Sequence, residues 1–341
     1  MAFEFVISPM KMSLVFLRAA ITRAVRRAPV WLLAVCAVAL AVVVLAAVPR
    51  ESYAWTPGTH VFLGEAVLGA LGQLPAAVAD VLRAYPYEFL YGSIAADTSI
   101  AKKYAPVGRH CHSWTVGFEI LDRANDEALR SFGMGYLAHL AADTVAHNYF
   151  VPRYLIIASR TTGLGHSYWE SRFETHLGPR YSREARELIV RDHTPADAHL
   201  DRILSPTIFS TQTNRRIFRG MVYVADTESW QRIFHLAADN SRWDLGTGEV
   251  VRYMVRSYEY VMDLLSRLDH SEPYLLDPSG DEALRLAKEV RRQARLSRME
   301  YHLSEEAGRH FGMPDTQLDF SSRLSAPLYP PSPNPARSDS N

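Results

Sequence analysis

The sequence predicts an all-α fold, a multi-helix bundle preceded by an N-terminal hydrophobic segment. Apolar residues recur at three- and four-residue steps through most of the chain after Trp55, which is the period of an amphipathic helix. No run of alternating β-branched residues is long enough to indicate a sheet. With 341 residues and 48% hydrophobic content, the chain can bury one large core or two small ones.

Residues 1–54 are predicted to direct export. Residues 29–49 carry no charged side chain and follow four arginines, which favours an N-terminus in the cytoplasm. About 20 apolar residues can span a bilayer, whereas the apolar core of a signal peptide usually has roughly 7–15. Small residues at Ser52 and Ala54 favour cleavage after Ala54, which gives a periplasmic or secreted protein that begins with Trp55. The alternative is an uncleaved segment that anchors the protein in the cytoplasmic membrane.

Residues 55–324 are predicted to form the helical domain. His60–Leu74 has apolar residues at helical spacing and ends before a proline, and Ala76–Tyr85 repeats this pattern. Tyr91–Tyr104 is predicted to be a loop that holds Asp97.

Further helices are predicted along the rest of the chain by the same apolar spacing. They cover Ser113–Ser131, Phe132–Tyr149, Gly165–Leu177, Ser182–Arg191, Val250–Leu268 and Asp281–Glu306. The last of these carries many charges, so we expect one of its faces to be solvated. Residues 325–341 are rich in proline and serine and are expected to be a disordered tail, because they have too little apolar surface to pack.

The charge balance disfavours a nucleic-acid partner. The first 54 residues hold six of the 37 basic and two of the 37 acidic side chains, so the remainder has a net charge of −4. A nucleic-acid binder usually presents a basic surface. Cys36 and Cys111 are the two cysteines of the chain, and Cys36 lies in the hydrophobic segment. The exported part therefore has no internal disulfide, and we expect Cys111 to be a buried apolar residue.

A row of potential metal ligands is the most informative pattern of the chain. His139, Asp143 and His147 are four residues apart, so on a helix they turn by only about 40° per step and share one face. Their neighbours are apolar or small, which predicts that these side chains point into the interior. A buried carboxylate needs a cationic partner, and nitrogen and carboxylate ligands suit zinc. A histidine core with hydrogen-bonded carboxylates and no metal is the alternative.

Other candidate ligands surround this helix in the sequence. Trp55 precedes His60 by five residues, and a second His-x3-Glu pair lies further along the chain. His110 competes with His112, but the His-Ser-Trp context favours His112. Together the candidates supply five histidines and three carboxylates, more than one metal needs: His60, Asp97, His112, His139, Asp143, His147, His166 and Glu170.

The order of these residues resembles the zinc-dependent phospholipases C, which share an all-helical fold with the S1/P1-type nucleases. The resemblance implies three zinc ions and a mature N-terminal tryptophan whose amino and carbonyl groups bind metal. The implied ligands are Trp55, His60 and Asp143 for one zinc, Asp97, His112, His139 and a bridging Asp143 for the second, and His147, His166 and Glu170 for the third. Three features depart from the family: His147 follows Asp143 after four residues rather than six, the interval from His112 to His139 is short, and Thr98 stands where an aromatic residue helps to bind choline.

The expected activity is hydrolysis of a phosphodiester, with a phospholipid at the membrane surface as substrate and diacylglycerol as a product. In multi-zinc sites, two metals about 3.5–4 Å apart bind phosphoryl oxygens and activate water. Asp97 is the expected catalytic residue, which orients or deprotonates that water. The alternatives are a nuclease of the same fold, a membrane-anchored metal-binding envelope protein with little activity, and a purely structural helical bundle. The low positive charge of the exported part disfavours the nuclease.

Overall fold

The computed structural model describes residues 55–100, 102–106, 108–158, 165–227, 232, 241, 243, 245–296, 302–316 and 318–320. Within these ranges every regular element is helical and there is no strand, which confirms the all-α fold class. The predicted signal or anchor over residues 1–54 and the predicted tail over residues 325–341 lie outside the described residues. Within the part of the chain that is described, no helix combines the length and apolar character needed to cross a membrane.

The elements follow one another without long connections in the described ranges. The α-helices are α3 Pro57–Leu68, α4 Ala76–Ala84, α5 Pro86–Ala95, α6 Trp114–Asp122, α7 Glu127–Val145, α8 Val151–Ile157, α9 Gly165–Glu174, α10 Pro179–Ile189, α11 Thr194–Ile203, α12 Thr211–Ala225, α14 Thr247–Arg267, α15 Asp281–Leu296 and α16 Leu303–Phe311. The short turns are the 3-10 turns η1 Leu71–Gln73, η2 Ala96–Thr98, η3 Lys102–Tyr104, η5 Leu268–His270 and η6 Pro273–Leu275, and the π turn η4 Ala146–Phe150.

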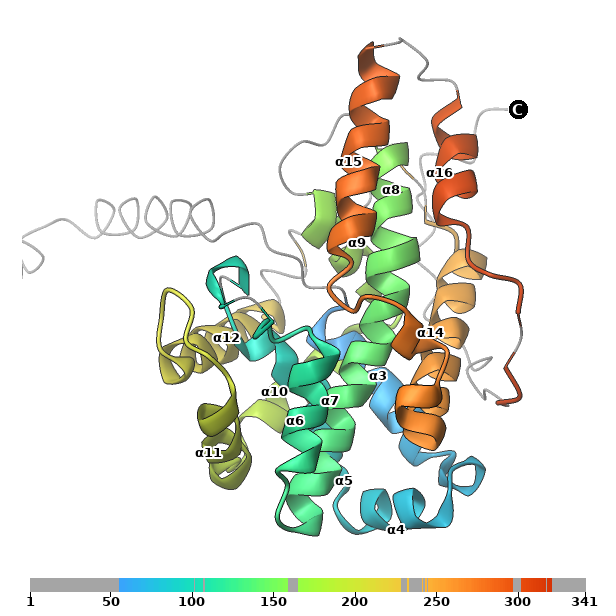
Figure 1. Cartoon of the computed structure of the whole chain (residues 1–341). Coiled ribbons are helices and arrows are strands. Elements are labelled where there is room, and N and C mark those ends of the chain that lie inside the picture. The colour runs from blue at the N-terminus through green and yellow to red at the C-terminus, as the bar shows by residue number, and fades with distance from the viewer. Residues whose placement is uncertain are drawn as a thin grey trace, which may run out of the picture. The chain divides into compact units, whose positions relative to one another are not determined.

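Helix α7 is the centre of the fold. Asp126 caps its first turn, because its carboxylate accepts a hydrogen bond of 2.7 Å from the backbone N–H of Leu129. Every residue from 131 to 145 is buried, and α5, α6 and α14 pack against the helix. Figure 1 shows α6 beside α7 in the lower half of the view. A helix buried on all sides has no solvated face, so the polar residues on it need partners inside the protein.

Helices α5 and α7 cross at two glycines. A Cβ atom on Gly92 would lie 2.1 Å from the carbonyl oxygen of Phe132, and a Cβ on Gly135 would lie 2.0 Å from that of Phe89. No side chain fits at these distances, so the two backbones are in direct contact. This crossing brings the end of α5 and the following η2 turn, with Asp97, against the middle of α7.

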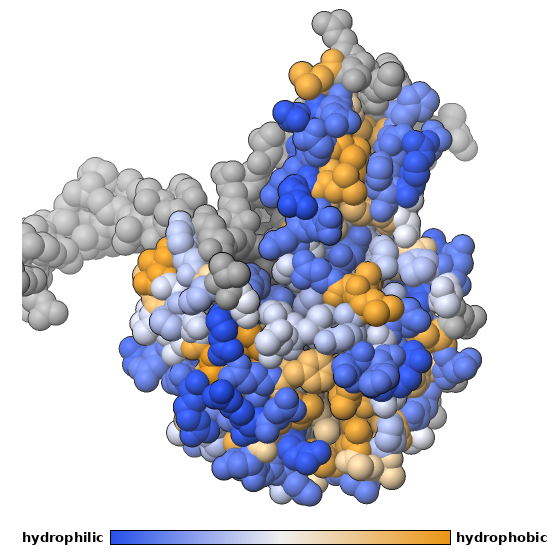
Figure 2. All heavy atoms as spheres, in the orientation of Figure 1, coloured by the Kyte–Doolittle hydropathy of each residue, from blue (hydrophilic) through white to orange (hydrophobic). Residues whose placement is uncertain are grey.

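A π turn, η4, joins α7 to α8, and the two helices continue along one direction (Figure 1). Helices α15 and α16 pack on α8 and bury a small second core of Ile156, Ala287, Leu303, Ala307 and Phe311. Figure 2 shows this packing from outside, as an apolar strip between the polar surfaces of α15 and α16. The apolar faces of these two amphipathic helices are therefore turned towards α8.

Three predicted boundaries were wrong. The predicted loop from Tyr91 begins inside α5, because packing on α7 stabilises a helix whose buried face is too wide to show an amphipathic period. The predicted break after Ser131 lies instead at residues 123–126, where Asp126 starts α7. The predicted helix from 281 to 306 ends at Leu296, and α16 begins at Leu303.

Candidate metal centre

Five candidate ligands from four parts of the chain meet beside α7. His60 comes from α3, Asp97 from η2, His112 from the segment before α6, and His139 and Asp143 from α7. Each side chain is at most 2% exposed. The histidines and carboxylates that the sequence spreads over more than 80 residues are thus brought into one buried cluster.

The carboxylate of Asp143 is the meeting point of the histidines. Its Oδ2 lies 2.9 Å from Nε2 of His112 and 3.1 Å from Nε2 of His139. Its Oδ1 lies 3.2 Å from Nε2 of His60. The two ring nitrogens of His112 and His139 are themselves only 3.1 Å apart. Three imidazole nitrogens therefore converge on one carboxylate, and its two oxygens face different histidines.

Asp97 lies within 4 Å of two of these histidines. Its Oδ1 is 3.4 Å from Nε2 of His112 and 3.9 Å from Nε2 of His139. The ammonium group of Lys102 is 3.1 Å from the same oxygen. Burial raises the pKa of the Asp97 carboxyl, but Lys102 and the histidines more than offset this and hold the pKa below its usual value. Asp97 is consequently a carboxylate at neutral pH.

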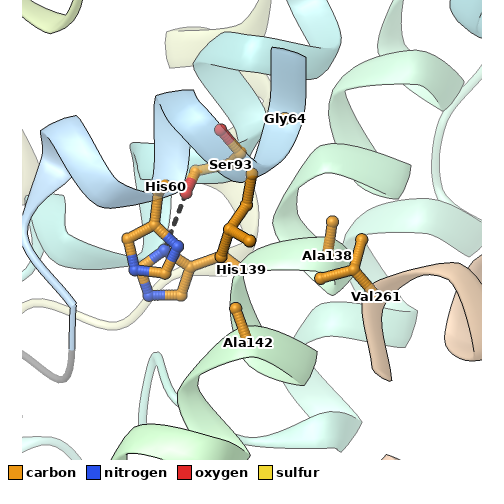
Figure 3. Close-up of a pocket in the computed structure, with 8 residues that line it drawn as sticks. His60, Gly64, Ser93, Ala138, His139, Ala142 and Val261 are labelled. Atoms are coloured by element: carbon orange, nitrogen blue, oxygen red, sulfur yellow. Dashed lines mark hydrogen bonds between the residues drawn. The ribbon is translucent and has the colours of Figure 1, made fainter. Parts of the chain in front are cut away.

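Backbone carbonyls fix the orientation of two histidines. Nδ1 of His139 lies 2.8 Å from the carbonyl oxygen of Ser93, and Nδ1 of His147 lies 2.6 Å from that of Pro278. A carbonyl only accepts, so each Nδ1 carries the proton and each Nε2 carries the lone pair. Figure 3 shows His139 below Ser93 with the ring of His60 stacked on it, the ring centroids being 3.9 Å apart. Metal-binding histidines are usually oriented in this way.

The pKa values of the buried acidic groups in and beside the cluster shift in opposite directions. Burial raises the pKa of Asp143, but His139, His112 and His60 hold it well below its usual value. Burial and repulsion from Asp97 and Asp143 raise the pKa of Glu170 well above its usual value. The shift of Glu170 therefore indicates that this carboxyl group lacks a compensating positive charge, whereas Asp97 and Asp143 are already stabilised as anions. A divalent cation would relieve this repulsion.

Several buried polar atoms of the cluster also fit a metal. Among the described residues, no hydrogen-bond partner with suitable geometry is found for Nε2 of His60, Oδ2 of Asp97 or either oxygen of Asp143. Leaving such atoms unpaired in the interior costs roughly 1–3 kcal/mol each. Two overlapping sets, His60–Asp97–His139 and His112–His139–Asp143, have ligand atoms within 4.8 Å of one another. This donor set of nitrogen and carboxylate oxygen suits zinc.

Residues 59–211 match the model that describes the family "Zinc dependent phospholipase C". Over these residues the chain is similar to the zinc-dependent phospholipases C. The match covers the residues from α3 to the start of α12, and so it includes all five clustered side chains. No curated protein and no solved structure matches the chain significantly.

The remaining candidate ligands lie in different places around this cluster. Trp55 is fully buried, its indole N–H donates a 3.0 Å hydrogen bond to the carbonyl of Ala142, and its ring packs on Phe150 and Phe173. Trp55 therefore lies beside α7, and its hydrogen-bond partner on α7 is the residue that precedes Asp143.

The candidates for a third zinc are less closely grouped. His147 lies in the η4 turn, its ring centroid 6.1 Å from that of His112, and Glu170 is buried in α9. The position of the His166 side chain lies outside the described residues. The structure therefore brings His60, Asp97, His112, His139 and Asp143 together, and places His147 next to them.

His110 and Cys111 flank His112 with different contacts. Nδ1 of His110 accepts a hydrogen bond of 3.1 Å from the backbone N–H of His112, so the lone pair of this nitrogen is already used. Cys111 is buried, as expected, and its sulfur lies 3.3 Å from Nδ1 of His112. These contacts favour His112 over His110 as a ligand.

Sequence reasoning missed Lys102. This lysine is only 6% exposed and its ammonium lies 3.1 Å from Asp97 and 3.1 Å from Nε2 of His112. Lysine is almost never fully buried, and Lys102 follows Asp97 in a stretch without helical period. Its short distance from Asp97 in the sequence was the available signal.

Proposed function

We propose that the domain is a zinc-dependent phosphodiester hydrolase, a phospholipase C that cleaves the head group from a phospholipid. The convergence of His60, His112 and His139 on Asp143 carries this proposal, because the composition and burial of this cluster suit a divalent metal. Zinc, when bound, polarises phosphoryl oxygens and lowers the pKa of water towards neutrality. The family match supports the same activity.

Asp143 is proposed to bridge two metal positions. One of its oxygens faces His60, and the other faces His112 and His139. A carboxylate with this geometry can serve two metal positions at once, which fixes their separation. His60 and Trp55 would complete one set of ligands.

Asp97 is proposed as the residue that acts on water. Its Oδ1 contacts Lys102 and His112, whereas its Oδ2 has no hydrogen-bond partner among the described residues. The second oxygen can therefore accept a hydrogen bond from the attacking water and orient it. The low pKa of Asp97 keeps it in the basic form at neutral pH.

The proposal extends to the number of metals and to the start of the mature protein. Asp97 and the histidines around Asp143 would hold a second zinc, and a third set would comprise His147, His166 and Glu170. Trp55 contributes an amino group only if the chain is cleaved after Ala54. N-terminal sequencing of exported protein tests this step, and a mature N-terminus other than Trp55 would remove that ligand.

Substitution of one carboxylate and one histidine of the cluster tests the proposed activity. Asp97→Asn and His139→Ala should lower phosphatidylcholine hydrolysis by at least a hundredfold while far-UV circular dichroism stays helical. His270→Ala is the control, because its side chain is 84% exposed and lies outside the cluster. Wild-type-like turnover by Asp97→Asn would refute its role. Faster turnover of single-stranded DNA than of phosphatidylcholine would favour the nuclease.

A further inference from the structure

Lys102 is the one charged side chain of the cluster that cannot bind a metal as it stands. It lies in η3, and its ammonium is 3.1 Å from Oδ1 of Asp97. It is also 3.1 Å from Nε2 and 3.2 Å from Nδ1 of His112. An ammonium group has three donors and no lone pair, so it is a partner for the ligands rather than a ligand itself.

The ammonium contacts two groups that a metal would bind, the carboxylate of Asp97 and the ring of His112. Zinc binds histidine nitrogen and carboxylate oxygen at about 2.0–2.2 Å. A zinc ion bound to Oδ1 of Asp97 would therefore lie at most about 5 Å from the Lys102 nitrogen, which is 3.1 Å from the same oxygen. The mutual repulsion of two cations at such a separation in a buried site is large.

We infer that Lys102 is an internal cation that competes with zinc for Asp97 and His112. Occupation of this position by metal requires the ammonium to move away, so the zinc bound there is held more weakly than the zinc bound to His60 and Asp143. The inference rests on the proposed function, because it presupposes that the cluster binds zinc. It assigns to Lys102 the role of setting the metal affinity of one position.

The geometry makes the role of Lys102 twofold. In protein stripped of metal, its positive charge offsets the buried carboxylate of Asp97, which would otherwise be costly. During zinc uptake, the same charge opposes the metal. Removal of the ammonium should thus lower the stability of the stripped protein and raise its affinity for zinc.

Titration of the chelator-stripped full chain with zinc alone tests this inference. Lys102→Met keeps the length of the side chain and removes its charge, and Lys288→Met on α15 is the matched control, since Lys288 is exposed. We expect Lys102→Met to bind its weakest zinc at least tenfold more tightly than wild type in a competition with a chromophoric chelator. The stripped Lys102→Met protein should unfold at a lower temperature than the stripped wild type. Lys288→Met should match wild type in both measurements.

The outcomes separate this inference from the proposed function. If wild type binds zinc and Lys102→Met binds every zinc equally or more weakly, the inference about Lys102 is wrong and the proposed function stands. If wild type binds no zinc, both are wrong. Should Lys102→Met fail to fold, Lys102→Gln gives the same test with a polar end group that can still donate to Asp97.

Discussion

The glycine contact between α5 and α7 gives a prediction with a magnitude. A Cβ at Gly135 would lie 2.0 Å from the carbonyl oxygen of Phe89, and real Cβ atoms essentially never approach within 3.0 Å. Gly135→Ala must therefore separate two backbones by at least 1 Å, and no flexible side chain can give way. Overpacking of this kind costs up to about 3 kcal/mol. The better helix propensity of alanine offsets about 1 kcal/mol of this cost, so we expect the free energy of unfolding to fall by about 2 kcal/mol.

The assay is urea or thermal unfolding followed by circular dichroism. A loss of about 2 kcal/mol corresponds to a decrease in Tm of about 4–8 °C for a domain of this size. Gly220→Ala on α12 is the matched control, because a Cβ there meets nothing within 4 Å and the variant should gain up to about 1 kcal/mol. The same separation would lengthen the 2.8 Å contact between His139 and Ser93, so Gly135→Ala should also bind zinc more weakly. Equal stability of Gly135→Ala and Gly220→Ala would refute the reasoning.

Three further predictions concern other parts of the domain. Gly280 has a φ of +61° and a Cβ there would lie 2.4 Å from Cβ of His147, so Gly280→Ala should lower the zinc content measured by mass spectrometry by one ion while the helix content is kept. Trp55→Phe removes the indole N–H that donates to α7 and should lower the free energy of unfolding by about 2 kcal/mol in urea titrations. Burial and the nearby Glu184 raise the pKa of Glu65 to about 7. Because this folded-state pKa is above the unfolded value, the stability that protonated Glu65 contributes at low pH should be lost as the pH rises from about 5 to 8. Glu65→Gln should not show that loss, and identical pH profiles of unfolding would contradict the assignment.

The sequence predicted the ligand helix well, for a physical reason. His139 and Asp143 are four residues apart among apolar neighbours, and this local spacing alone puts both on one face of α7. The positions of Asp97 and His60 relative to that face depend on how α3, α5 and α7 pack. They were expected from the family resemblance, whereas periodicity alone does not give them.

Helix α5 and Lys102 show what the sequence pattern left out. Most of α5 from Phe89 onward is buried, so the apolar period that identifies an amphipathic helix is missing, and a glycine and a serine lower its helix propensity. Lys102 is buried only because Asp97 and His112 offer it partners that are assembled by the fold. The π turn at His147 likewise depends on tertiary packing, including the close approach of Gly280.

The central claim is that Asp143 and the histidines around it form a zinc centre. Anomalous diffraction at the zinc absorption edge, from crystals of the zinc-loaded chain, tests this claim most directly. Zinc peaks within about 2.0–2.2 Å of Asp143, His139 and His60 are the predicted result. A zinc-saturated crystal without a peak at Asp143 would contradict it.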